Sequence, residues 1–146
     1  MKGRIIAVCR GKEKGKPKED VGSGFLEKNF GLVGDAHAGA VKQVSILVKE
    51  KVDQLARKTG LSFPPGCFAE NILISGINQE DLLPGKILRA GTALLQIERI
   101  GKEPNITHSY NYRGYSLLPQ YGIFARVLES GIIKNGDEVE VLNSWI

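Results

Sequence analysis

The chain has 146 residues, of which 42% are hydrophobic and 25% charged, and this composition fits one soluble globular domain with a sizeable core. It has no apolar run near the roughly 20 residues that span a bilayer, and residues 1–6 lack the apolar centre of a secretory signal, so the expected compartment is the cytoplasm. The formal net charge of +4 favours anionic ligands without indicating nucleic acid.

The N-terminal half predicts three short strands and one long helix. A strand is expected over residues 4–9, which are rich in β-branched side chains, and further strands over residues 25–30 and 44–48. Apolar residues then recur at helical spacing from Val48 to Ala56, with Lys and Asp between them. Gly60 is a typical residue for the C-terminal end of this helix.

The C-terminal half predicts short strands separated by turns. Pro64, Pro65 and Gly66 break the chain before a strand over residues 72–74, and Asn78 is placed to cap one helical turn. Strands are expected over residues 87–89 and 93–100, and apolar and acidic residues alternate over 138–141. Short strands with 18 glycines and no linker or repeat favour a single mainly β domain over residues 1–146, built as a barrel or sandwich.

Five basic residues fall close together after the first strand, namely Arg10, Lys12, Lys14, Lys16 and Lys18. One interpretation is a solvated, mobile loop, and the other is a lid over an anionic ligand. Aromatic residues are not interleaved with these cations, so a stacking surface for nucleic acid is not favoured.

Asp35 and His37 form the best candidate pair for a site. They lie two residues apart in the glycine-rich stretch GLVGDAHAG, so in an extended segment their side chains face the same way. The aspartate could orient the imidazole, which could donate to an anion or move a proton. The alternative is a tight turn in which Asp35 caps and His37 is structural.

The other polar candidates each have a structural alternative. Gln43 and Ser45 could supply neutral hydrogen bonds, and Glu70 with Asn71 could bind a polar heterocycle such as a pterin or could bond within their own turn. His108 could bind a metal but is more typical of a surface residue. Four tyrosines could stack on a heterocycle or could simply wall the domain: Tyr110, Tyr112, Tyr115 and Tyr121.

The two cysteines, Cys9 and Cys67, do not match a zinc-binding spacing, and a reducing cytosol disfavours a disulfide between them. Cys67 lies between Gly66 and Phe68 and is expected to be a small buried residue rather than a nucleophile.

Five motifs in order resemble a stand-alone MOSC domain, the family named after the C-terminal domain of molybdenum cofactor sulfurases: GLVGDAHAG, QVSIL, GCFAENI, LLPG and YGIFARVLESG. The resemblance covers nearly the whole chain. It implies a mainly β, barrel-like domain, and together with the predicted helix the expected fold is a partly closed β-barrel with one longer helix. It also implies a role in molybdenum-cofactor or sulfur metabolism, with molybdenum, a molybdenum-cofactor enzyme or pyridoxal phosphate as associated ligands and partners.

The resemblance adds three cations to the candidate ligand-binding residues. Lys42 stands where many relatives carry an arginine before QVS, which weakens a bidentate anion clamp there. Lys102 and Arg126 lie in the family-like segments GKE and GIFARV, and such cations suit phosphate. Solvated side chains are the alternative, more so for Lys102 than for Arg126.

The departure from the family concerns cysteine. Relatives usually read GKEC where this chain has Pro104, and their further cysteines correspond to positions near His108 and Ser116. Proline offers neither a nucleophile nor a soft metal ligand. The leading hypothesis is a MOSC-type protein that binds an anionic cofactor or substrate without the usual cysteine chemistry. The alternatives are an active sulfur carrier or molybdenum-cofactor enzyme that uses a displaced thiol, and an RNA-binding β-barrel suggested only by basicity.

Overall fold

The structure is a computed structural model, and it describes residues 1–101 and 110–142. The strands are β1 (Lys2–Arg10), β2 (Glu19–Asp20), β3 (Ser23–Glu27), β4 (Gly31–Leu32), β5 (Val44–Val48), β6 (Ile72–Ser75), β7 (Ile87–Ala90), β8 (Ala93–Ile100), β9 (Ile123–Glu129), β10 (Gly131–Lys134) and β11 (Glu138–Leu142). The helices are α1 (Lys49–Thr59), α2 (Leu118–Tyr121) and the single 3₁₀ turn η1 (Gln79–Asp81).

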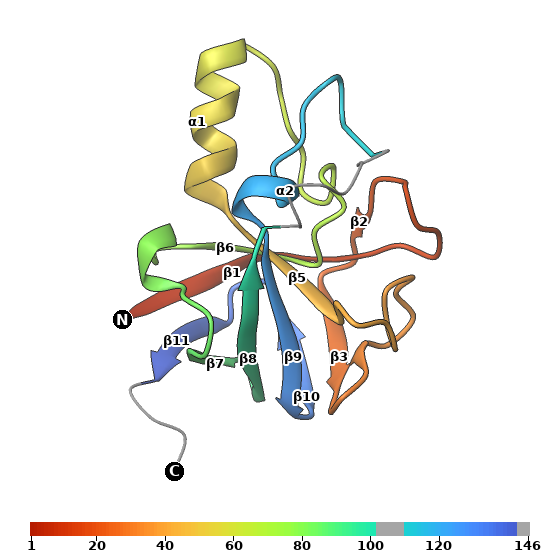
Figure 1. Ribbon diagram of the computed structural model, residues 1–146, viewed down its shortest axis with the longest axis vertical. Coiled ribbons are helices and arrows are strands. Elements are labelled where there is room, and N and C mark those ends of the chain that lie inside the picture. The colour runs from red at the N-terminus through yellow and green to blue at the C-terminus, as the bar shows by residue number, and fades with distance from the viewer. Residues whose placement is uncertain (102–109, 143–146) are drawn as a thin grey trace.

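Seven strands of the described chain close into a barrel. They follow the order β11-β7-β8-β9-β5-β6-β1, and pairing of β1 with β11 closes the ring, with Lys2 opposite Glu140 and Arg4 opposite Glu138. Only β5 and β6 pair in parallel within this ring, because α1 connects them. A smaller sheet of β10, β3 and β4 lies beside the barrel (Figure 1). The mainly β barrel fold expected from the sequence is confirmed.

Alternate residues of the same strands supply two apolar cores. Ile46 and Val48 of β5, and Ile72 and Ile74 of β6, belong to the cluster inside the barrel. Leu47 and Leu73 point the other way and join a second cluster with Val52 of α1 and with Phe63, Phe68 and Phe124. Because the central strands are buried on both faces, they read as continuous apolar runs rather than as alternating patterns.

Helix α1 forms where the periodicity predicts it. It spans Lys49–Thr59, its one buried residue is Val52, and it lies above the strands together with α2 in Figure 1. Gly60 follows with a left-handed φ of 73°, and its N–H donates to the carbonyl oxygen of Ala56 at 2.8 Å. This is the C-terminal glycine stop expected from the sequence.

Two local expectations are corrected. The strand expected over residues 25–30 runs over Ser23–Glu27, because Asn29 has a φ of 56° and the Phe30 N–H donates to the carbonyl oxygen of Glu27, which makes a turn. A helical turn does follow Asn78, but the Asn78 side chain does not cap it.

None of the helices in residues 1–101 and 110–142 is long and apolar enough to cross a membrane.

Candidate functional site

Three side chains from two loops meet beside the end of β1. The Nζ atom of Lys18 lies 2.8 Å from each carboxylate oxygen of Asp35 and 3.1 Å from Nδ1 of His37. The Lys18 and Asp35 side chains are almost fully buried, with 1% and 0% exposure, whereas the His37 side chain is 35% exposed. The structure therefore places the one partly exposed member of the cluster over a buried ion pair.

Backbone contacts hold the two loops together. Oδ1 of Asp35 accepts a hydrogen bond from the Gly11 N–H at 3.1 Å, and Oδ2 accepts one from the His37 N–H at 3.0 Å. The N–H of Ala36 donates in turn to the Gly11 carbonyl oxygen at 2.7 Å. Figure 1 shows the loop after β1 and the loop after β4 at the same side of the barrel. Asp35 therefore joins segments that are 24 residues apart.

The surroundings favour the charged form of Asp35 and act in opposing directions on Lys18. Burial raises the pKa of Asp35, but the neighbouring His37 and Lys18 side chains and the His37 N–H outweigh burial and hold that pKa well below its usual range. Burial lowers the pKa of Lys18 below its usual value, and the hydrogen bond and charge of Asp35 offset only part of that shift. Because Nζ lies 2.8 Å from both oxygens, this geometry stabilises the ammonium form.

A cavity of about 450 Å³ lies next to this cluster. We call it the basic cavity; it is lined by Arg10, Gly11, Lys12, Glu13, Lys16, Pro17, Glu19 and Val21. Gly11 borders both the basic cavity and Asp35. Arg10 passes close to Gly34, where an added Cβ would lie 3.1 Å from the Arg10 Cδ atom. Three cations against two carboxylates give the basic cavity a net positive wall, which suits an anion.

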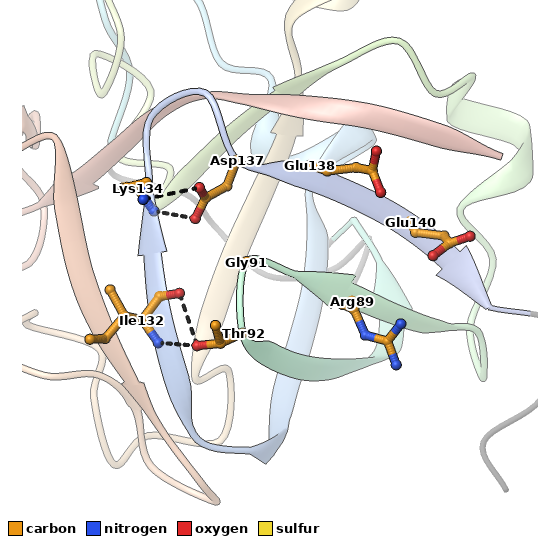
Figure 2. Close-up of a pocket in the computed structure, with 8 residues that line it drawn as sticks. All are labelled: Arg89, Gly91, Thr92, Ile132, Lys134, Asp137, Glu138 and Glu140. Atoms are coloured by element: carbon orange, nitrogen blue, oxygen red, sulfur yellow. Dashed lines mark hydrogen bonds and ion pairs between the residues drawn. The ribbon is translucent and has the colours of Figure 1, made fainter.

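A second cavity, of about 510 Å³, is lined by residues on or beside β7, β10 and β11 (Figure 2). It carries two cations, Arg89 and Lys134, against three carboxylates, Asp137, Glu138 and Glu140. Figure 2 shows Lys134 facing Asp137 and Thr92 bonded to the backbone of Ile132. Its net negative lining makes it a poor site for an anion.

Lys18 is the residue that sequence reasoning missed. The expectation grouped it with the loop cations, and Lys16 fits that interpretation with a side chain 66% exposed. Lys18 is instead buried, because it follows Pro17 into β2 and its N–H donates to the Gly66 carbonyl oxygen at 2.9 Å. Nothing in its residue type or spacing distinguishes it from its neighbours.

Glu70, Asn71 and Ser45 make hydrogen bonds within the protein. The Glu70 carboxylate accepts from the backbone N–H groups of Gly66 and Phe68 at 2.9 and 3.2 Å. Asn71 accepts from the Ser45 N–H at 3.1 Å and donates to the Cys9 carbonyl oxygen at 3.2 Å. All three residues are buried, which favours the structural alternative for them.

The remaining sequence candidates lie apart from the cluster or outside the described residues. Oε1 of Gln43 accepts from the Val127 N–H at 3.1 Å, and Arg126 donates to Oε1 of Gln96 at 3.1 Å. The Lys42 ammonium lies 5.2 Å from the centre of the Phe124 ring. Lys102, Pro104 and His108 lie outside the described residues.

The described tyrosines have partners within the protein. Tyr112 and Tyr115 pack edge-on against Phe63, and the Tyr110 hydroxyl donates to the Cys67 carbonyl oxygen. Tyr121 lies under the ammonium group of Lys51 at 4.8 Å. These contacts favour a wall around the second apolar cluster over a stacking platform.

Both cysteines are buried, at 0% exposure for Cys9 and 3% for Cys67. Burial raises the pKa of both thiols, that of Cys67 to about 12, and the charge of Glu70 adds to this effect. The expectation that Cys67 is a small buried residue is confirmed. Neither thiol is available as a displaced nucleophile, and no group of three or more His, Cys, Asp or Glu side chains within residues 1–101 and 110–142 is placed to hold a metal ion.

We therefore expect iodoacetamide to leave both thiols of the folded protein unmodified at neutral pH, and to alkylate both in urea. Intact mass spectrometry after a short reaction measures this directly. Rapid alkylation of one thiol in the folded protein would contradict the burial and would restore the displaced-thiol alternative.

A model of the MOSC domain family matches residues 33–140, and the chain belongs to this family. Its fold is similar to that of YuaD from Bacillus subtilis, with a TM-score of 0.74, 18% identity, and coverage of 97% of this chain and 96% of that chain. It is also similar to YiiM from Geobacillus stearothermophilus, with a TM-score of 0.72, 21% identity, and coverage of 97% and 75%. YiiM from Escherichia coli matches with a TM-score of 0.69, 21% identity, and coverage of 99% and 71%. A search of the curated proteins finds no match.

Proposed function

We propose that this MOSC-family chain binds a small anionic cofactor or substrate, of the phosphate-bearing molybdenum cofactor class, at the basic cavity beside His37. The observation that carries the proposal is the buried Lys18–Asp35 pair, which contacts a partly exposed imidazole and is joined through Gly11 to the wall of the basic cavity. Burying an ion pair is costly unless its geometry is excellent. A pair of this quality beneath an exposed histidine supports a role in positioning that histidine.

The residues present fit one end of the molybdenum cofactor. Arg10, Lys12 and His37 suit its phosphate group through charge and hydrogen bonding. The described part of the chain offers no exposed thiolate for the metal, since Cys9 and Cys67 are buried. The proposal is therefore a binding protein that contributes no thiol chemistry of its own from these two cysteines.

The test compares variants purified from a molybdenum-replete host. We expect His37→Ala to lower the retained cofactor about tenfold, because a hydrogen bond to a charged group contributes about 1.5 kcal/mol or more. Molybdenum content and the fluorescence of the oxidised pterin measure the retained cofactor independently. Phosphate affinity, measured by calorimetry, extends the test to a simple anion.

Matched controls separate the site from general charge effects. His108→Ala removes the other histidine, and Arg89→Ala removes a cation from the second cavity, whereas Arg10→Ala removes one from the basic cavity. Arg10→Ala is expected to follow His37→Ala, and the two controls are expected to follow the wild type. Equal losses in His37→Ala and His108→Ala would overturn the proposal.

A further inference from the structure

The contacts of the Lys18 ammonium constrain the proton position on His37. An ammonium group has three N–H donors and no acceptor. Two of these donors are directed to the Asp35 oxygens at 2.8 Å, and the third contact of Nζ is with Nδ1 of His37 at 3.1 Å. Nδ1 must therefore be the acceptor in that contact. A neutral imidazole that accepts at Nδ1 carries its proton on Nε2.

In the competing arrangement Nδ1 carries the proton and directs it at Asp35, which would help to lower the Asp35 pKa, but the distances do not favour it. If Nδ1 carried the proton, its nearest acceptor would be Oδ2 of Asp35, which lies 3.7 Å away and is beyond hydrogen-bond range. That oxygen already accepts from Lys18 and from the His37 N–H. An Nδ1 proton would also face the ammonium group, so two donors would point at each other.

We propose that Lys18 is a positioning residue that fixes His37 as a neutral Nε2–H donor, so that this site recognises an acceptor atom of an oxyanion and does not ligate a metal ion. Among the described residues Nε2 makes no hydrogen bond, while the ring is 35% exposed. Its one polar hydrogen is therefore available to a ligand. A metal ion would need a lone pair on Nε2, and supplying it would move the proton to Nδ1 against Lys18.

The identity of the ligand in this inference rests on the proposed function, whereas the position of the proton on His37 is argued from the distances alone. The inference distinguishes oxyanions from metal ions, two ligand classes that a histidine normally binds equally well. It also assigns a purpose to a lysine that is buried beneath a site rather than exposed in it.

The first experiment reads the tautomer directly in the wild-type protein. The chain has two histidines, so ¹⁵N-histidine labelling gives two ring systems, and a His108→Gln variant assigns them. A long-range ¹H–¹⁵N spectrum at about pH 8, above the ordinary histidine pKa of about 6.5, distinguishes protonated from unprotonated ring nitrogens. We expect His37 to show a protonated Nε2 and an unprotonated Nδ1. A protonated Nδ1, or the averaged mixture of a free imidazole, would overturn the proposal.

The second experiment tests the role of Lys18. Lys18→Met removes the donor to Nδ1, and Lys16→Met is the matched control two residues away on an exposed side chain. Lys18→Met should shift His37 toward a tautomer mixture, while Lys16→Met should leave its spectrum unchanged. An unchanged His37 tautomer in folded Lys18→Met would refute the positioning role. If Lys18→Met does not fold, the wild-type spectrum alone decides.

The third experiment tests the ligand class with inorganic phosphate and with Zn²⁺. Phosphate should shift the Nε2–H signal of His37 and leave the proton in place, and Zn²⁺ should leave His37 unchanged. Removal of the Nε2 proton by Zn²⁺ would overturn the inference. A confirmed tautomer with no response to phosphate would overturn the oxyanion assignment and the proposed function together, yet leave the Lys18–His37 geometry established.

Discussion

Replacing Lys18 with methionine should destabilise the fold by about 3–5 kcal/mol, which is the usual cost of leaving one partner of a buried ion pair uncompensated. The Lys18 and Asp35 side chains are 1% and 0% exposed, so water cannot replace the lost ammonium group. Methionine keeps an unbranched chain of similar length, so the change tests charge more than volume. Urea unfolding followed by circular dichroism gives the free energy of unfolding.

Two controls show whether the loss belongs to the pair. Lys16→Met removes an exposed lysine paired with Glu13 at 3.0 Å and should change stability by no more than about 0.5 kcal/mol. The double variant Lys18→Met with Asp35→Asn removes both charges and should recover part of the loss, as a double-mutant cycle would report. A Lys18→Met effect as small as that of Lys16→Met would show that the pair is not stabilising.

The difference in the free energy of unfolding between the wild type and Lys18→Met should become smaller as the pH falls. The folded-state pKa of Asp35 lies below its unfolded value, so its contribution is present above about pH 4 and is lost as the pH falls through the folded pKa. In the Lys18→Met variant the buried Asp35 carboxylate has no counter-ion, so the variant folds more readily when Asp35 is protonated. Acidification therefore lowers the free energy of unfolding of the wild type and raises that of the variant.

Replacing Gly66 with alanine should cost about 3 kcal/mol or more, because it combines backbone strain with a steric clash. Gly66 has a φ of 86°, and a Cβ added there would lie 2.1 Å from the Lys18 carbonyl oxygen. The substitution pushes apart the two segments whose contact buries Lys18. Chemical denaturation of the purified variant measures the loss.

Gly60→Ala is the matched control for strain alone. Gly60 has a φ of 73°, and an added Cβ there meets no atom within 4 Å. Its cost should be about 1 kcal/mol, the usual penalty for a left-handed non-glycine residue. Equal losses for the two alanine variants would mean that the contact between Gly66 and Lys18 is not a constraint on the fold.

The sequence predicts the helices and strands that have one buried face and one exposed face. Helix α1 has one apolar face and a glycine stop, and β8 shows the alternation of a half-buried strand, so both are found from periodicity. The strand β9 escapes this reasoning because it is buried on both faces and shows no alternation. The closure of the barrel brings β1 to β11 across almost the whole chain, which a local pattern does not encode.

The candidate site was predicted only in part for a related reason. Asp35 and His37 are found because glycines surround them within one short segment. Lys18 depends on a fold that brings together residues 17 positions apart, and its own neighbourhood is typical of an exposed loop. Glu70 and Asn71 have side chains that suit a ligand and a turn equally well, and only their hydrogen-bond partners distinguish the two roles.

The closed ring also limits how this protein can associate with other chains. A sheet with open borders exposes unpaired N–H and C=O groups, on which a foreign strand can grow. Within the described ranges, every barrel strand is paired with another strand on both of its edges, so only the small sheet and β2 have unpaired edges. The borders offered by β2 and β4 are two residues long, and β10 supplies four. Aggregation that begins by strand addition therefore has little template in the folded molecule and would require the ring to open first.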